Sequence, residues 1–313
     1  MARAIRDDLA NAELLVTFFR FLTAAAGTAM HPDLRRATRE ISARIAEETD
    51  YRHEAANITA FSELYRGHPF IRVPEVIGEA SGDRVLTMTY LEGLDWATAQ
   101  EADPNLKNTW AEVIFRFVLG SFRHANLFHA DPHPANYCFG VDGTVGFVDF
   151  GCVTVLSESQ RYGRVANVRA AIDGRKHDVR ALLVEMGFIA SDSTVTAEQA
   201  YEWMAGLVYE FIAPQPVTYT HTAARRAIGA LIDVRSPNHP FRRMSIPDDF
   251  VFSSRIHLSV TAILAALGAT GYARSVIDDM DGVAEPITPL GQQHRAWLSK
   301  RGLPYGLDTH YQS

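Results

Sequence analysis

Apolar residues recur every three to four positions over most of this chain of 313 residues. Such spacing is typical of helices that bury one face. In the first part of the sequence it predicts helices over residues 4–23, 32–48 and 51–64. Gly67 and Pro69 then end the helical pattern, because neither residue type suits a helix interior.

Four short apolar runs bounded by turn residues predict strands in two pairs. The pairs are 72–78 with 84–89, and 137–139 with 145–148. Asp142-Gly143 lies between the members of the second pair and predicts a two-residue hairpin turn. The first pair is interrupted by a turn at residues 81–83.

The second half of the chain is predicted to be almost wholly helical. A long, mostly buried helix over 106–126 precedes the second strand pair, and six more helices are predicted at 158–171, 177–186, 197–211, 223–232, 248–267 and 272–280. Pro286, Pro289 and Pro304 predict a loop for the tail from residue 285. The predicted fold class is therefore α+β and predominantly α.

Composition sets outer limits on this picture. Hydrophobic residues make up 47% of the chain, enough for a sizeable core in one large or two small domains. A net charge of −7 argues against a general nucleic-acid partner, since such proteins neutralise phosphates with excess basic residues.

The cysteines and histidines offer little metal chemistry. Cys138 and Cys152 have no neighbours at metal-ligand spacing and are interpreted as reduced, core-packed thiols of a cytoplasmic protein. Only His129 and His133 cluster with acidic residues. The prolines beside them predict a rigid loop and not a zinc site.

Two apolar stretches resemble membrane segments without meeting the requirements. Residues 14–26 are interrupted by Arg20, and residues 251–269 contain Arg255 and His257. A transmembrane helix needs about 20 apolar residues. Both stretches are predicted to be helices packed on the core, and a peripheral membrane contact through one of them stays open.

The strongest chemical signal is the segment His-Ala-Asp-Pro-His-Pro-Ala-Asn at 129–136, followed by Asp-Phe-Gly at 149–151. Asp131, Asn136 and Asp149 occur in the order of a protein-kinase centre: catalytic-loop Asp, metal-binding Asn and metal-binding Asp. Carboxylate and amide oxygens suit Mg²⁺, and a further carboxylate can orient the attacking hydroxyl. The set predicts ATP and Mg²⁺ as cofactors. The competing interpretation is that these residues only cap a turn and end a strand.

The same segment resembles the catalytic loop of the UbiB/AarF atypical kinases. Upstream, the stretch 48–57, Glu-Thr-Asp-Tyr-Arg-His-Glu-Ala-Ala-Asn, resembles that family's E-x-D motif and the helix after it. Other similar segments are 67–70, 73–76, 89–93, 172–175 and 185–188. The resemblance extends from about residue 4 to about residue 279, and its E-x-D and catalytic-loop motifs are its specific part.

The resemblance implies a protein-kinase-like fold with an incomplete small lobe over 1–92, a helical large lobe over 93–284 and a tail over 285–313. It also implies site roles. The catalytic residues would be Asp131, His129 and Glu54; the nucleotide side would include Tyr90, Leu91, Glu48 and Asp50; and the metal ligands would be Asn136 and Asp149. Thr89–Gly93 would be the hinge between the lobes.

The chain lacks the lysine that such a site uses to hold ATP phosphates. Its three lysines are Lys107, Lys176 and Lys300, and none precedes Glu54, the glutamate expected to pair with it. No phosphate-binding loop precedes Glu54 either. We expect a truncated relative or fragment with very weak phosphoryl transfer; the alternative is that Met1 is an internal start within a longer protein.

Three functions therefore stay open. The first is a UbiB-like kinase or ATPase, linked by the resemblance to isoprenoid-quinone or lipid metabolism. The second is a small-molecule phosphotransferase of the aminoglycoside or choline kinase type, and the third is a pseudokinase scaffold. An open edge on the strand pair 72–78 and 84–89 also predicts self-association.

Overall fold

The computed structural model describes residues 51–222, 243–245 and 247–306. By its contacts the chain divides into two compact units, Met1–Thr49 and Asp50–Ser313, and every described residue belongs to the second. The helices predicted over 4–23, 32–48 and 223–232 lie outside the described residues. The predicted domain boundaries at 92 and 284 stay predictions.

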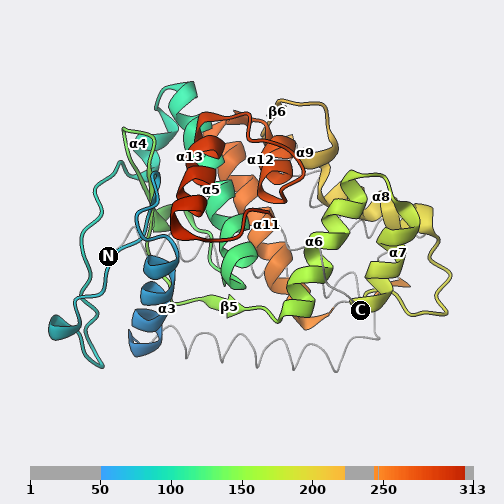
Figure 1. The fold of residues 1–313 in the computed structure, drawn as a ribbon, viewed down its shortest axis with the longest axis horizontal. Helices are drawn as coiled ribbons and strands as arrows, with labels where there is room; N and C mark the ends of the chain where they lie inside the picture. Colours follow the sequence, from blue (N-terminus) through green and yellow to red (C-terminus); the bar gives the residue numbers. More distant parts are fainter. Residues whose placement is uncertain (1–50, 223–242, 246, 307–313) are drawn as a thin grey trace. The chain divides into compact units, whose positions relative to one another are not determined.

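Helix α5, Pro104–Ala125, contacts helices and strands from the first, middle and last parts of the described chain (Figure 1). Its sequence contains apolar residues on nearly every side, and buried members include Trp110, Ile114 and Phe117. A helix that is apolar all round belongs in a core. Asp103 caps its first turn by accepting from Asn105 N–H at 2.8 Å, and Asn126 ends it in a left-handed conformation. The prediction over 106–126 is confirmed.

Helix α3, Tyr51–Leu64, matches its predicted bounds. Ile58 and Phe61 are fully buried on one face of this helix, as their spacing of three predicts. Gly67, with φ of 67°, follows the helix and lets the chain turn where other residue types would be strained.

The first predicted strand pair forms only in part. Strand β1 is just Ile71–Arg72, and it pairs in parallel with β4, Val145–Phe147, instead of with residues 84–89. Between 72 and 92 there are only isolated contacts of strand type, such as Val76 with Met88, and a short 3₁₀ helix over Gly78–Ala80. Residues 72–78 and 84–89 therefore do not form regular strands, and the prediction is wrong on this point. A lone two-stranded hairpin has only marginal stability.

The second pair is confirmed as β3, Tyr137–Phe139, and β4, in a sheet of order β1-β4-β3. Its turn differs from the prediction. Gly140 N–H donates to Thr144 O at 2.8 Å, so residues 141–143 form a three-residue loop in which Gly143 has φ of 87°. A three-residue loop of this kind needs glycine only at its last position, so Asp142 is not forced into a left-handed conformation.

Four further strands were not predicted. Strands β2, Leu127–His129, and β5, Val153–Val155, pair antiparallel, with His129 opposite Val153. Each has only three residues, too few for a period-two pattern to be recognised. The pairing of β2 with β5 brings together the chain segment before residue 131 and the segment after residue 151. Strands β6, Val217–Thr218, and β7, Thr270–Gly271, form a separate short pair.

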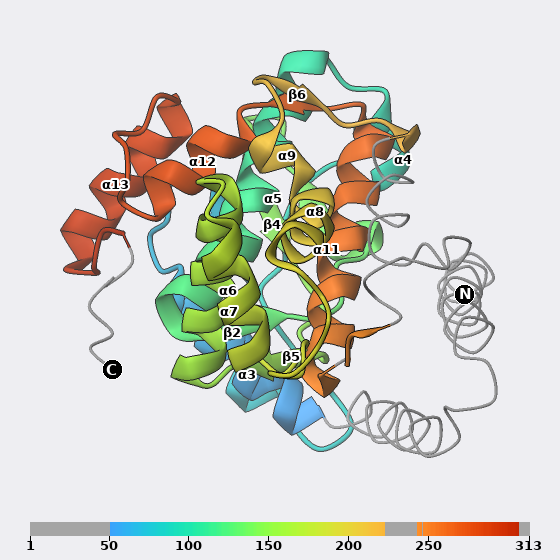
Figure 2. The ribbon, with the colours of Figure 1, turned by 90° about the vertical axis from the view of Figure 1, so that its right-hand side faces the viewer.

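The remaining helices largely follow the prediction. They are α4 Trp96–Gln100, α6 Glu158–Ile172, α7 Lys176–Glu185, α8 Ala197–Leu207, α9 Tyr209–Ile212, α11 Asp248–Leu267 and α12 Ala273–Met280. Figure 2 shows α6, α7 and α8 side by side, in agreement with their contacts. Of these helices only α4 was not predicted, and 197–211 is split between α8 and α9. Mostly helical with small sheets, the described structure is α+β and predominantly α, as predicted.

The apolar run over 251–269 falls mainly within α11, where Val260, Ile263 and Leu264 are buried against the core. In the ranges that the structure describes, no helix has both the length and the apolar character needed to cross a membrane. The run over 14–26 lies outside those ranges.

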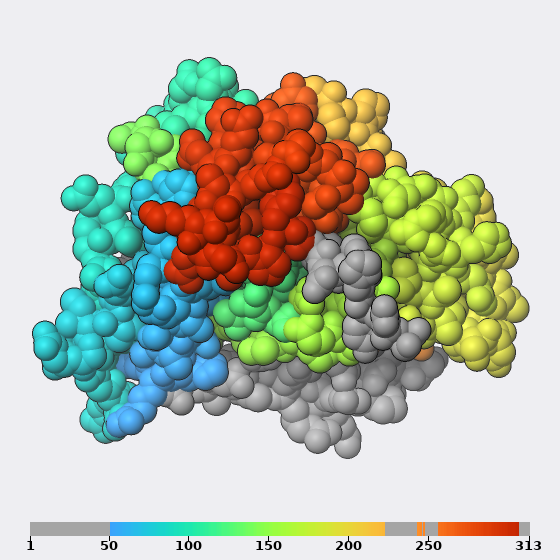
Figure 3. All heavy atoms as spheres, viewed as in Figure 1, coloured from blue at the N-terminus to red at the C-terminus, as the bar shows by residue number. Residues whose placement is uncertain are grey.

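The tail from residue 285 is not a loop, contrary to the prediction. Helix α13, Pro289–Arg301, begins with Thr288 as its cap and with Pro289 in the first turn, where proline is well tolerated. In Figure 3 its surface meets that of the segment after α3. There Trp297 Nε1 donates to Arg66 O at 3.0 Å. The prolines that suggested a loop flank this helix or start it.

Arg116 carries a charge into the core and determines how α12 and α13 pack on α5. Its side chain is 0% exposed, and its two terminal nitrogens donate to the Asp279 carboxylate at 3.1 and 2.6 Å, while Nε donates to Glu112 at 2.9 Å. Paired acids hold the Arg116 pKa above its ordinary value despite burial. A Cβ at position 291 would lie 2.7 Å from an Arg116 nitrogen, so only glycine allows α13 this approach.

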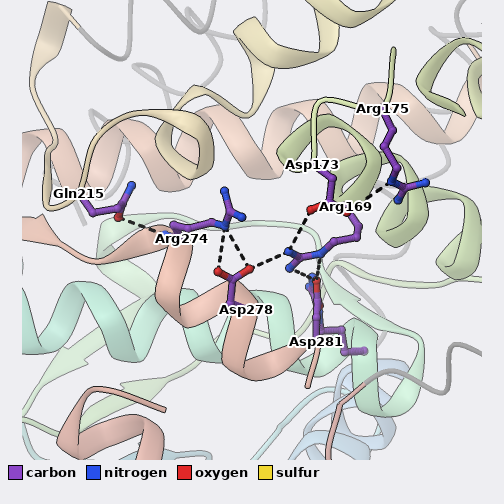
Figure 4. Close-up of polar contacts among 8 residues, drawn as sticks. Arg169, Asp173, Arg175, Gln215, Arg274, Asp278 and Asp281 are labelled. Atoms are coloured by element: carbon purple, nitrogen blue, oxygen red, sulfur yellow. Dashed lines mark hydrogen bonds and ion pairs between the residues drawn. The ribbon is translucent and has the colours of Figure 1, made fainter. Parts of the chain in front are cut away.

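A second group of ion pairs connects α5, α6 and the end of α12 (Figure 4). Asp281 accepts from Arg123 Nε at 2.9 Å and from Arg169 Nη2 at 2.7 Å, and its side chain is 3% exposed. Asp278 accepts from Arg169 and from Arg274 at 2.7 and 2.9 Å. Because each carboxylate serves two guanidinium groups, removing Asp281 would leave two arginines without this partner.

Three histidines meet where α13 packs on α5. His68 Nδ1 accepts from Ile71 N–H at 3.1 Å, so its Nε2 carries the proton and donates to His294 Nδ1 at 2.9 Å. The ring of His124 lies 5.7 Å from that of His294. Burial lowers the pKa of all three, that of His124 to about 4. The charge of Arg116 lowers the pKa of His68 and His294 further, and those of Arg123 and Arg161 lower the pKa of His124. The three imidazoles are therefore neutral in the folded protein.

These histidines should make the fold sensitive to acid. Below their ordinary pKa of 6.5 the unfolded chain takes up protons that the folded protein does not, so stability falls as the pH falls. His124 alone would account for a loss of about 1.5 kcal/mol between about pH 6.5 and about pH 5. We expect His124→Leu to flatten the dependence of the thermal midpoint on pH, and His177→Gln, on the exposed side of α7, to leave it unchanged. Equal slopes for His124→Leu and the unmodified protein would contradict this account.

Asp281→Ala should destabilise the fold strongly, since it leaves Arg123 and Arg169 buried without this carboxylate. Breaking one side of a buried ion pair costs about 3–5 kcal/mol, which urea unfolding would measure. Glu198→Ala is the matched control, because it breaks an exposed pair with Lys176. It should change the unfolding free energy much less. Similar losses for the two variants would show that the ion pairs of Asp281 add no special stability.

Candidate functional site

The segment after β2 brings Asp131 and Asn136 together. His129 ends β2, and a short 3₁₀ helix, Pro134–Asn136, follows under a cap from His133, whose Nδ1 accepts from Ala135 N–H at 3.2 Å. Asn136 is 8% exposed, and its Nδ2 donates to the Asp131 carbonyl at 3.2 Å. This bond uses the amide nitrogen of Asn136 and leaves its Oδ1 as the atom that can coordinate a cation.

The β3–β4 hairpin returns the chain to the same place. Tyr137 pairs with Phe147, and Val148 N–H donates to Asn136 O at 2.9 Å. Asp149 therefore follows directly after a residue bonded to Asn136, although the two are far apart in sequence. The prediction that a hairpin sets their separation is confirmed.

Asp149 has an unusual backbone for a residue with a side chain. Its φ is 64°, in the left-handed region, and its side chain is exposed. Oδ1 accepts from Gly151 N–H at 3.3 Å, which orients the carboxylate at the start of the turn. Non-glycine residues in this conformation cost about 1–3 kcal/mol and persist where surrounding contacts hold them.

His129 supplies one of those contacts. It is 3% exposed, and its Nε2 lies 2.8 Å from the Asp149 carbonyl oxygen. A carbonyl can only accept, so Nε2 carries the proton. Burial lowers the His129 pKa, although Asp131 and the Asp149 carbonyl favour the charged form. His129 is thus a neutral donor to the backbone, and its Nε2 faces Asp149 instead of solvent.

Helix α3 contacts the same turn from the other side. Asn57 Nδ2 donates to the Phe150 carbonyl at 2.8 Å, and the ring of Phe61 lies 4.9 Å from that of Phe150. The Glu54 carboxylate is near Asp149. Burial and then the Asp149 charge raise the Glu54 pKa, while the Phe150 N–H, which points at it, acts in the opposite direction. The structure therefore brings Glu54 to the Asp149 turn.

The residues present fit Mg²⁺ better than a transition metal. Asn136 and Asp149 offer oxygen ligands, and Mg²⁺ is commonly held by one or two protein oxygens together with phosphates and water. Across the described residues there is no cluster of three His, Cys, Asp or Glu side chains that could hold a metal. His129 Nε2 and His133 Nδ1 are engaged with the backbone.

The predicted nucleotide-side residues differ in their surroundings. Leu91 packs on β4, where a Cβ at Gly146 would lie 3.0 Å from Leu91 Cδ1. Tyr90 is 85% exposed and points away from the core. Glu48 and Asp50 lie outside the described residues. The free cysteines are half-buried instead of core-packed, with Cys138 on β3 and Cys152 after the turn.

Asn57 and Phe61 were not predicted as part of the site. Both lie on the face of α3 that also contains Glu54, at helical spacings of three and seven. Asn57 ends the stretch whose similarity to the E-x-D motif was already evident. Its position one turn after Glu54 is the signal that could have identified it.

The sequence of this chain is similar to those of several known proteins. The chain is 32% identical over 160 residues to "Protein ACTIVITY OF BC1 COMPLEX KINASE 1, chloroplastic" of Arabidopsis thaliana, a match that covers 50% of this chain and 23% of the relative. It is 31% identical over 166 residues to the uncharacterized protein sll0005 of Synechocystis, covering 52% and 24%. The chain thus spans about a quarter of the length of these relatives.

Two further similarities extend beyond the site. The atypical kinase COQ8B, mitochondrial, of Rattus norvegicus is 25% identical over 263 residues, 83% of this chain and 47% of the relative. The structure of Rv3197 from Mycobacterium tuberculosis, solved in complex with erythromycin, superposes with a TM-score of 0.66 at 23% identity. It covers 91% of this chain and 69% of the other, and at this identity it shows the fold alone.

The decisive match is to a family as a whole. Residues 1–183 fit the sequence model of the ABC1 atypical kinase-like domain. That segment includes the catalytic loop, the hairpin and the Asp149 turn. Because it makes up more than half of the 313 residues, the chain belongs to the ABC1 atypical kinase-like family, the UbiB/AarF kinases that its motifs resemble.

Proposed function

We propose that this chain binds a magnesium nucleotide and acts on its terminal phosphate, as an atypical kinase or ATPase. The observation that supports it is the grouping of Asp131, Asn136 and Asp149: Asn136 donates to the Asp131 carbonyl and accepts from Val148 N–H, the residue directly before Asp149. Mg²⁺ would neutralise the charge that develops on the phosphates. A residue that only caps a turn or ends a strand does not require an exposed carboxylate on a strained backbone. The turn-capping interpretation therefore explains Asp149 poorly.

Each residue has a distinct part in this proposal. Asn136 Oδ1 and the Asp149 carboxylate would hold the cation. Asp131 is half-buried beside Asn136 and would accept or orient the proton of the attacking hydroxyl. His129 would hold the Asp149 carbonyl in place by donating to it, without contacting the phosphates.

Glu54 is the residue whose role depends most on a missing partner. In kinases a glutamate at this place holds a lysine that clamps the phosphates. Here Lys107 donates to Gln100 O, Lys176 pairs with Glu198, and Lys300 is in the last turn of α13. A lysine for Glu54 would therefore have to come from outside this sequence. We propose that turnover by these 313 residues alone is very weak.

The substrate and surroundings are proposed on resemblance alone. An isoprenoid-quinone precursor or another lipid is the substrate class that the family similarity suggests. Tyr90 and Leu91 would border the nucleotide base, with Glu48 and Asp50 on its phosphate side. A peripheral membrane contact, self-association through a sheet edge and a cytoplasmic location are further proposals, which rest on patterns in the sequence and not on the resemblance.

A pseudokinase scaffold is the alternative that a specific observation favours, because no lysine of this chain pairs with Glu54. A scaffold of this kind need not bind nucleotide or metal. The small-molecule phosphotransferase alternative has no such support, and the family match disfavours it.

Nucleotide binding separates these alternatives. We expect a non-hydrolysable ATP analogue to raise the thermal midpoint of the 313-residue chain with Mg²⁺ and much less with EDTA, since a ligand of the folded state stabilises it by mass action. Asp149→Ala should remove the Mg²⁺-dependent part of the shift. Asp192→Ala, on an exposed turn after α7, is the matched control and should keep it. No shift under any condition would favour the scaffold.

The charge on Glu54 should weaken the metal-free fold. Its carboxylate faces Asp149, and an acid whose pKa is raised on folding destabilises the folded state above its ordinary pKa. Glu54→Gln keeps an acceptor for the Phe150 N–H and removes the repulsion. We expect this variant to unfold at a higher temperature than the unmodified chain at neutral pH, in EDTA.

Glu79→Gln, in the exposed 3₁₀ helix, controls for the loss of one negative charge elsewhere. It should leave the thermal midpoint nearly unchanged. A lower midpoint for Glu54→Gln than for Glu79→Gln would show that the Glu54 charge stabilises the fold through another group.

A further inference from the structure

The backbone at Asp149 and Phe150 is held at two consecutive carbonyl groups by side chains from different elements. His129, at the end of β2, donates to the Asp149 carbonyl at 2.8 Å. Asn57, on α3, donates to the Phe150 carbonyl, also at 2.8 Å. These residues are separated by more than 70 positions in the sequence, so the turn is held between two parts of the fold.

This turn needs such support because Asp149 has φ of 64°. The left-handed region brings Cβ close to the carbonyl oxygen and is unfavourable for residues with a side chain, although aspartate and asparagine adopt it more readily than most. An aspartate persists there only where its surroundings hold the adjoining peptide groups in place. The bond from Gly151 N–H to Asp149 Oδ1 orients the side chain, but it lies within the turn and cannot anchor the turn to the rest of the protein.

Helix α3 is a rigid base for Asn57. Ile58 and Phe61, on the same side of the helix, are fully buried, and Phe61 packs on the Phe150 ring at 4.9 Å. Tyr65, just past the helix, donates to Phe117 O on α5 at 3.0 Å. A donor on such a helix has little freedom to follow a moving turn, so it favours one backbone position.

We propose that Asn57 is a positioning residue for the metal site: through the Phe150 carbonyl it holds Asp149 in the conformation that directs its carboxylate at the cation. This inference rests on the proposed function, in which Asp149 is a metal ligand. Asn57 touches neither metal nor phosphate. Its loss should therefore weaken binding of the cation and leave metal-free nucleotide binding nearly unchanged.

Two variants of the 313-residue chain test it. Asn57→Ala removes the donor, and Asn57→Leu removes it while filling the same space. Manganese serves as the probe, titrated in the presence of a non-hydrolysable ATP analogue. Loss of one hydrogen bond changes an equilibrium about fivefold. We expect both variants to bind Mn²⁺ about fivefold more weakly. Their affinity for the analogue without metal should change less than about twofold.

Thr59→Ala is the matched control, because Thr59 is on the exposed side of α3 and its hydroxyl donates to Ala55 O of its own helix. It should bind Mn²⁺ like the unmodified chain. An unchanged Mn²⁺ affinity in Asn57→Ala and Asn57→Leu would overturn the proposal. So would an equal fall in metal-free nucleotide affinity, which would mean that the whole site had been disturbed.

Hydrogen exchange gives a second readout that needs neither metal nor nucleotide. Exchange of the amides at 148–152 should become faster in Asn57→Ala and Asn57→Leu, and stay unchanged in Thr59→Ala. Equal exchange in all chains would overturn the inference. If the unmodified chain bound no Mn²⁺, the proposed function would fail, while the exchange of these amides would still decide whether Asn57 holds the turn.

Discussion

The arrangement of the helical part depends on the neutralisation of positive charge inside it. Arg116 is 0% exposed, at the centre of α5, and an isolated charge there would be prohibitively costly. Asp279 must therefore lie beside it, which fixes α12, and Gly291 allows α13 to approach. Asp281, two residues on, serves Arg123 and Arg169 in the same way. The final segments are thus bound to α5 by charge as well as by apolar packing.

The site relies on a different kind of restraint, carried by the backbone. The β2–β5 pairing and the bond from Ala130 N–H to Cys152 O at 2.9 Å bring the two ends of the segment together. The hairpin then places Asp149 next to Asn136. Side chains of β2 and α3 bind the carbonyls around Asp149, whose strained φ is the price of directing its carboxylate outward.

Most helices were predictable because their apolar spacing and caps are local signals. The predicted bounds of Tyr51–Leu64 and Pro104–Ala125 lie close to the observed ones, and the order and spacing of Asp131, Asn136 and Asp149 are enough to indicate their chemistry. The failures have a physical reason. Residues 72–78 and 84–89 are apolar enough for strands, but they pair with each other only at isolated positions, and Arg72 pairs with Gly146 of β4. The prolines near 286–289 suggested a loop, where one of them in fact starts α13.

The sequence by itself determined the residue types of the site, their order, the family and the helical character of the chain. Those follow from motifs and from periodicity within a few turns. Tertiary structure alone decided that His129 faces the Asp149 carbonyl, that Asn57 reaches Phe150 and that Glu54 lies against Asp149. These contacts join residues some 20 to 95 positions apart, and no local pattern encodes such distances. They exist because the hairpin, the short strand pair and the buried face of α3 converge on one turn.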